Sequence, residues 1–212
     1  MKTRDLIQLL VEDGKQPSSP LGKTVALVFL GGVALIVAFF AIFVGMRPDF
    51  SEAIWTARVG FKMAIVIALA VAGFGLLLQL GRPTARVAPW IWFIVALAAV
   101  LLTGSIVELF MIPSDRWSNN LNGSNRTFCL VAIPALSIIP LVAAIVGLRN
   151  GAPINSTLAG AGAGLAAGAV GATLYALNCN NDSPLFVAAW YPIAIGFVVL
   201  TGAILGRTTL RW

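Results

Sequence analysis

The chain has 212 residues, of which 59% are apolar and 10% are charged, and its mean hydropathy is +0.94. These values exclude a water-soluble globular domain and predict an all-α, polytopic membrane protein. Membrane topology and anionic headgroups account for the formal net charge of +6. We expect no direct binding of DNA or RNA, because no basic stretch is interleaved with aromatic residues.

The chain begins with a polar leader, residues 1–23, whose first half reads MKTRDLIQLLVED. This half predicts a short amphipathic helix, because apolar residues recur at helical spacing and an aspartate lies in the first turn, where the helix dipole favours it. A helix this short is marginally stable alone in water. We therefore expect it to fold against a partner, and we assign partner binding to Asp5, Leu6, Ile7, Leu9 and Leu10.

Six apolar stretches follow, each close to the roughly 20 residues needed to cross a hydrocarbon core of about 30 Å. The segments between them are short, so no further domain is attached to the bundle. The first stretch is too long for a cleaved signal peptide and is expected to stay as an anchor. We predict a bundle over residues 24–205 and a tail at 206–212. The predicted spans are Thr24–Met46, Val59–Leu80, Val87–Ile112, Phe128–Leu148, Thr157–Leu177 and Leu185–Leu205.

The positions of Lys and Arg predict how the bundle is oriented. Nine of the basic residues lie on the face that holds both termini, and five lie on the other face. The positive-inside rule therefore places both termini in the cytoplasm. In a bacterium this is the topology of an inner-membrane protein whose leader faces cytoplasmic partners.

Two charged residues lie close to or inside the apolar runs. Lys62, near the start of the second span, is expected to extend outward to the membrane interface. Glu108 is the one carboxylate inside an apolar run, and an ionisable group in a span is a functional candidate because an unpaired charge there is costly. The alternative is that it lies in the wet outer interface and pairs with Lys62 or Arg116.

The fifth span carries Gly160, Gly164 and Gly168 at four-residue spacing. Such a ridge of small residues lets helix backbones approach closely inside a membrane. We interpret this span as a central packing helix rather than a pore lining. A homodimer face is the alternative.

The sequence contains no histidine, which removes most catalytic bases and most zinc sites. It also lacks a Walker loop, a dinucleotide fingerprint and a nucleophile elbow. We therefore predict that the protein is not an enzyme and holds no constitutive cofactor.

Two cysteines are the remaining reactive groups: Cys129 opens the fourth span, and Cys179 lies between the fifth and sixth. The spans between them cross the membrane and return, so both thiols are expected at the outer, oxidising face, where a disulfide can form. The first helical turn and Arg126 both favour a Cys129 thiolate. Thiolates bind soft metals, and Asp182 or Glu108 are candidates to complete a site for a transient ion. A static disulfide or two inert cysteines are the alternatives.

Several short motifs follow one another along nearly the whole chain. They are Met1–Ile7, Arg47–Asp49, Cys129, Arg149–Pro153, Cys179 and Leu205–Trp212. No single motif is specific, but in this order and placement they resemble the NrsF (negative regulator of sigma F) family. The chain departs from the family pattern at Trp190-Tyr191, where a Trp-His pair is expected.

The resemblance implies a six-span anti-sigma factor of the bacterial inner membrane. Such a protein holds an extracytoplasmic-function sigma factor inactive at the cytoplasmic face and releases it under heavy-metal or oxidative stress. The resemblance also implies that Cys129 and Cys179 are the sensing pair. The sigma factor would then cover the apolar stripe of the leader, as when an amphipathic helix binds in a groove of its partner.

Three other functions stay open from the residues alone. The leader would lie on the anionic inner leaflet if it bound no protein. A small transporter is a second alternative, although paired intramembrane charges and an inverted repeat are not evident. The third is a thiol-redox protein such as a disulfide-generating quinone enzyme, which would need a Cys-x-x-Cys pair that this chain lacks.

Overall fold

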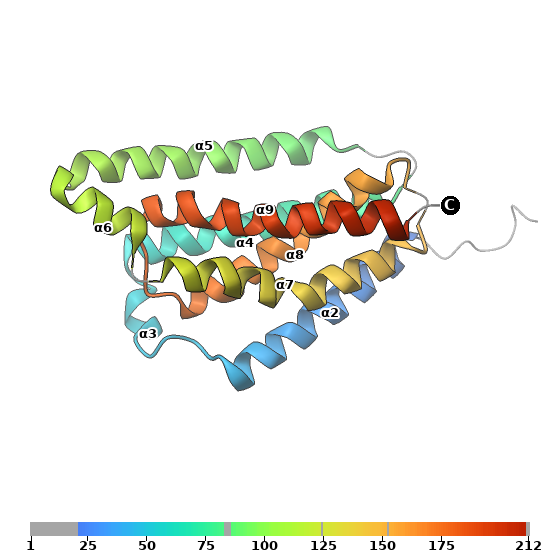
Figure 1. Ribbon diagram of the computed structural model, residues 1–212, viewed down its shortest axis with the longest axis horizontal. Helices are drawn as coiled ribbons and strands as arrows, with labels where there is room; N and C mark the ends of the chain where they lie inside the picture. The colour runs from blue at the N-terminus through green and yellow to red at the C-terminus, as the bar shows by residue number, and fades with distance from the viewer. Residues whose placement is uncertain (1–20, 83–85, 124, 152, 211–212) are drawn as a thin grey trace, which may run out of the picture.

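The computed structural model (Figure 1) describes residues 21–82, 86–123, 125–151 and 153–210. The predicted partner-binding residues of the leader therefore lie outside the described residues, and their role stays a prediction. They are Asp5, Leu6, Ile7, Leu9 and Leu10.

Every regular element among the described residues is a helix, and six helices are long and apolar enough to cross a membrane. The all-α, six-helix prediction is confirmed. The last helix extends about one turn beyond its predicted end at Leu205. The long helices are α2 (Leu21–Phe43), α4 (Ala57–Leu80), α5 (Ala88–Met111), α7 (Arg126–Leu148), α8 (Ser156–Asn178) and α9 (Pro184–Thr209). The short ones are α3 (Phe50–Ala53), the 3-10 helix η1 (Ser114–Arg116) and α6 (Trp117–Asn122).

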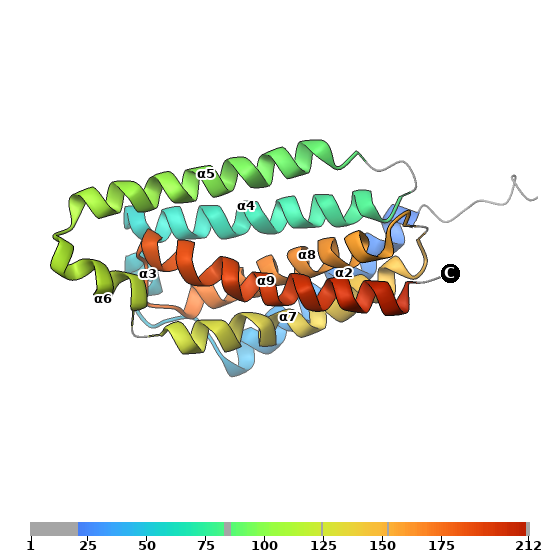
Figure 2. The same ribbon diagram turned by 45° about the horizontal axis from the view of Figure 1, so that its top comes forward.

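The two ends of the bundle differ in what they carry. α2 begins and α9 ends at one end, which we call the terminal end (Figure 1, Figure 2). The short helices and the connection between α8 and α9 lie at the other end. We call this the cysteine end, because Cys129 lies in the first turn of α7 there and Cys179 follows α8 there.

Helix α8 is the centre of the bundle and packs against α9, α4 and α7. Its Gly and Ala residues leave its backbone open to close approach by α9. A Cβ atom on Gly164 would lie 2.5 Å from the carbonyl oxygen of Val198, and one on Gly168 would lie 3.1 Å from Cγ2 of Ile195. Gly160 meets the backbone of α9 still more closely. The glycine ridge is thus covered by a helix of the same chain.

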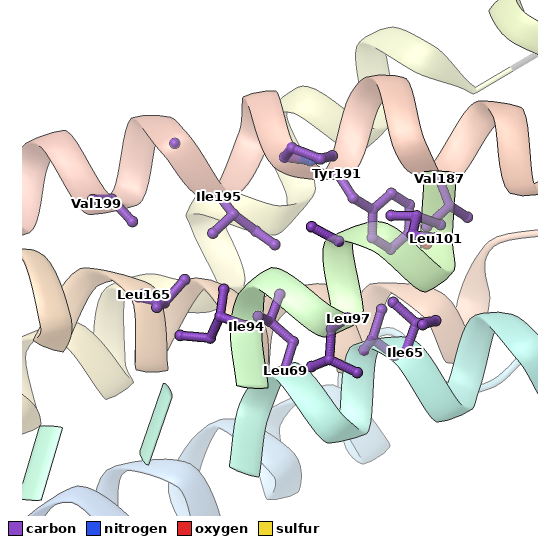
Figure 3. A pocket seen from close by; sticks show the side chains of 14 residues that line it. Ile65, Leu69, Ile94, Leu97, Leu101, Leu165, Val187, Tyr191, Ile195 and Val199 are labelled. Carbon is purple, nitrogen blue, oxygen red and sulfur yellow. The ribbon is translucent and has the colours of Figure 1, made fainter. Parts of the chain in front are cut away.

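Helix α5 lies at the edge of the bundle, where it contacts α4 and α9 (Figure 2). An apolar cavity of about 310 Å³ lies between these three helices (Figure 3). Side chains such as Leu69, Leu97 and Ile195 line it, and no charged residue of the described chain does so. This lining suits a hydrocarbon chain better than a polar solute.

Candidate functional site

The cysteine end gathers the buried ionic groups of the described chain. Arg47, Lys62 and Glu108 are all buried there, close to the connection between α8 and α9. We call this connection, residues 179–183, the cysteine loop. Buried charges are costly in a membrane protein unless they are paired, so this end is the natural candidate for function.

The two thiols lie in the protein core. Cys129 and Cys179 are both free and buried, and they belong to the same apolar cluster. Three aromatic side chains of that cluster pack on one another: Tyr191 contacts Tyr175 and Phe186. The tertiary structure therefore brings the two predicted sensing residues into one cluster, where they are shielded from water.

Arg126 does not face this cluster. Its side chain is exposed, and its Nη1 donates a hydrogen bond to Oδ1 of Asn122 at 2.9 Å. The guanidinium thus interacts with the end of α6, whereas the Cys129 thiol points into the core.

Lys62 lies inside the bundle, so the prediction that it extends to the membrane interface is wrong. Its side chain is 1% exposed and forms an ion pair with Asp182 at 2.5 Å. Its Nζ also donates to the carbonyl oxygen of Cys179 at 2.9 Å. The reason is its place on α4: Lys62 shares the buried stripe of Val59 and Val66, three residues from one and four from the other.

Arg47 reaches the same carboxylate from the connection between α2 and α3. Its Nη1 donates to Oδ2 of Asp182 at 2.8 Å and to the carbonyl oxygen of Cys179 at 3.3 Å. Its Nε lies 3.2 Å from the exposed carboxylate of Asp49. Arg47 belongs to the Arg47–Asp49 motif, but only the fold places it beside residues more than 130 positions away.

Asp182 is therefore the shared counter-ion of two buried cations, with one carboxylate oxygen toward each. It is engaged by these cations rather than free to bind a metal ion beside the thiols. Within the described part of the chain, no three Cys, Asp or Glu side chains converge as metal ligands. Of the Cys, Asp and Glu side chains in the described chain, only the two thiols would then be available as ligands for a soft metal ion.

Glu108 holds the far end of the cysteine loop. Its Oε2 accepts hydrogen bonds from the Ser183 hydroxyl at 2.6 Å and from a backbone N–H in the first turn of α9 at 3.1 Å. A carboxylate is favourable there because the helix dipole is positive at that end. Its ion-pair partner is Arg58, at 3.4 Å. The predicted pairing with Lys62 or Arg116 is wrong, and the side chain is buried rather than in water.

Fold and site together define a class: a polytopic α-helical membrane protein with its thiols and buried charges gathered at one end. The comparisons give the family. A family model described as "NrsF: Negative regulator of sigma F" matches residues 10–212. Over the full length of both chains, the protein is 30% identical to the "Probable anti-sigma-F factor NrsF" of Azospira oryzae and 32% identical to the "Anti-sigma-F factor NrsF" of Caulobacter vibrioides.

The chain therefore belongs to the NrsF family, and the resemblance inferred from its motifs is confirmed. No solved structure matches it.

Proposed function

We propose that this protein is an anti-sigma factor of a bacterial inner membrane and that it holds an extracytoplasmic-function sigma factor inactive. The observation that carries the proposal is membership of the NrsF family, with two anti-sigma-F factors matched over their whole length. The six apolar helices support the membrane location.

The leader is the part that we propose binds the sigma factor. Its last three residues, 21–23, form the start of α2, and the excess of basic residues near the terminal end favours a cytoplasmic position. Leu6, Ile7 and Leu10 would lie in an apolar groove of the sigma factor and order on binding. The bound leader would occlude a surface that RNA polymerase needs.

Cys129 and Cys179 are the proposed sensing pair, buried at the end of the bundle that we propose lies on the periplasmic side. Oxidation would join the two sulfurs in a disulfide, with two protons and two electrons passing to an oxidant such as a peroxide. A soft divalent metal would instead displace one proton from each thiol as two thiolates bind it. Either change would alter how α7, α8 and α9 pack, and a shift of rigid helices would carry it to the terminal end. The shared apolar cluster of the two cysteines supports this pairing.

The leader assignment predicts that deletion of Met1–Asp13 abolishes capture of the sigma factor. The double variant L6A/L10A should weaken binding strongly, because each buried leucine contributes about 2 kcal/mol, or about 30-fold in affinity. Q8A, on the polar face of the helix that the sequence predicts, is the matched control and should bind normally. The measurement is co-purification from native membranes, with sigma factors identified by mass spectrometry. Retention of the sigma factor by the deletion variant would contradict the assignment.

The sensing assignment predicts that the double variant C129S/C179S keeps the sigma factor repressed but no longer responds to stress. Serine is close in size to cysteine but forms neither a disulfide nor a soft-metal thiolate. The measurement is a reporter gene driven by the sigma factor, with and without cadmium or peroxide. S137A, which removes a buried hydroxyl from the same helix as Cys129, is the control and should respond as the wild type does. A normal response from the double cysteine variant would exclude the cysteines as the sensor.

A further inference from the structure

We propose that Arg47, Lys62 and Asp182 form an ionic latch that couples the cysteine loop to α2, and that opening of this latch passes the signal to the leader. The inference rests on the proposed function, since it names the path from sensor to output. In the resting state the latch is closed, as in this structure, where both thiols are free.

The latch holds the sensing residue Cys179 itself. Both Lys62 and Arg47 donate to the carbonyl oxygen of Cys179, at 2.9 Å and 3.3 Å. This oxygen and the thiol belong to one residue, so a new bond at the sulfur that turns or shifts the residue must also change both contacts. Oxidation or metal binding at the Cys179 thiol would therefore change how Lys62 and Arg47 are held.

The latch has few intermediate states between closed and open. The side chains of Lys62 and Arg47 are 1% and 5% exposed, whereas that of Asp182 is 20% exposed. A buried cation that loses its carboxylate is left with a desolvation penalty of several kcal/mol. Such a cluster is stable when closed or when opened to water. This is the discrete behaviour that a switch requires.

The latch also secures residues 44–49, the segment that connects the last turn of α2 to α3. The last turn of α2 projects from its neighbours in both views, and the chain then returns to α3 (Figure 1, Figure 2). Ile42 and Phe43 in this turn are 74% and 72% exposed. The return segment is tied to the end of α8 by two hydrogen bonds, from the Arg47 N–H to the Leu177 carbonyl oxygen and from Asn178 Nδ2 to that of Gly45.

Helix α2 is joined at its other end to the leader, which is the proposed sigma-factor-binding segment. Its other end is packed in the bundle: a Cβ atom on Gly147 of α7 would lie 3.2 Å from the Cα of Val25. The last three residues of the leader, 21–23, form the start of α2. Release of the latched end therefore changes the tilt of the helix to which the leader is joined.

The test replaces Arg47 in the full-length protein, because R47Q removes the α2 side of the latch and leaves the ion pair between Lys62 and Asp182 in place. D49N is the matched control, since it removes the other, exposed carboxylate that contacts the same guanidinium. Hydrogen–deuterium exchange of residues 40–47 in nanodiscs reads the movement of α2. A sigma-dependent reporter in unstressed cells reads the output, with the Met1–Asp13 deletion as the reference for full release.

R47Q is expected to raise exchange at residues 40–47 about tenfold and to raise the unstressed reporter toward the level of the deletion. It should do so in the C129S/C179S background as well, because the latch acts after the thiols. D49N should stay within about twofold of the wild type in both measurements. If R47Q does not accumulate in the membrane, R47K keeps the charge but loses the planar fork, and smaller changes of the same sign are expected.

The inference is wrong if residues 40–47 of R47Q exchange at the wild-type rate. It is also wrong if they exchange faster while the reporter in R47Q cells stays fully repressed. The deletion separates this failure from that of the proposed function. If the deletion itself leaves the reporter repressed, the proposed function is wrong. The exchange measurement then decides on the latch alone, with an unchanged rate refuting it and an increased rate supporting it.

Discussion

Replacing Gly202 with alanine is expected to destabilise the bundle by about 2–3 kcal/mol, within the range for overpacking a tight interface. Gly202 of α9 faces α8, where an added Cβ atom would meet the carbonyl oxygen of Gly160 and lie 2.9 Å from the Cα of Gly164. These are backbone atoms, so they cannot move aside as a side chain can. The two helices would have to separate along their whole contact.

Gly196 provides the matched control on the same helix. A Cβ atom there would meet no atom within 4 Å apart from the adjoining backbone of its own helix, so G196A should gain about 0.5–1 kcal/mol from the better helix propensity of alanine. Because G202A receives the same gain, the difference between the two variants isolates the packing term. Equilibrium unfolding in mixed micelles measures it. Equal stabilities of G202A and G196A would contradict the close approach of α8 and α9.

Replacing Asp182 with asparagine is expected to cost about 3–5 kcal/mol, because it leaves a buried cation without its counter-ion. Lys62 depends most on this carboxylate, since its ammonium group is almost fully buried and its other contacts are carbonyl oxygens. Loss of the carboxylate also removes a contact of Arg47. Thermal unfolding in nanodiscs is the measurement.

A double variant tests whether the cost of D182N comes from the unpaired charge. K62M/D182N removes both members of the ion pair and should recover a large part of the loss, because a buried ion pair is often replaced by apolar groups at little cost. D49N, at a carboxylate that is 62% exposed, should change stability by less than about 0.5 kcal/mol. If D182N is as stable as D49N, the buried ion pair does not hold this end together.

The sequence by itself determined the architecture. Hydropathy and length defined six helices, because crossing a hydrocarbon core requires a long apolar run whatever lies beside it. The four-residue spacing of Gly160, Gly164 and Gly168 identified the face of α8 that a helix could approach closely. The two spans between Cys129 and Cys179 are an even number of crossings, which places both cysteines at one end. All of these inferences depend on local pattern or on counting.

Only the tertiary structure decided which charges are buried and which groups pair. Lys62, Arg47 and Glu108 each bind the cysteine loop, more than 70 positions away in the sequence. Lysines near a membrane boundary usually extend to the interface, where water solvates the ammonium group. In this fold the carboxylate of Asp182 and the carbonyl oxygens of Cys179 and Asn181 solvate the ammonium group of Lys62 instead. These partners are brought together when helices that are distant in the sequence pack against one another, and no local sequence pattern predicts such contacts.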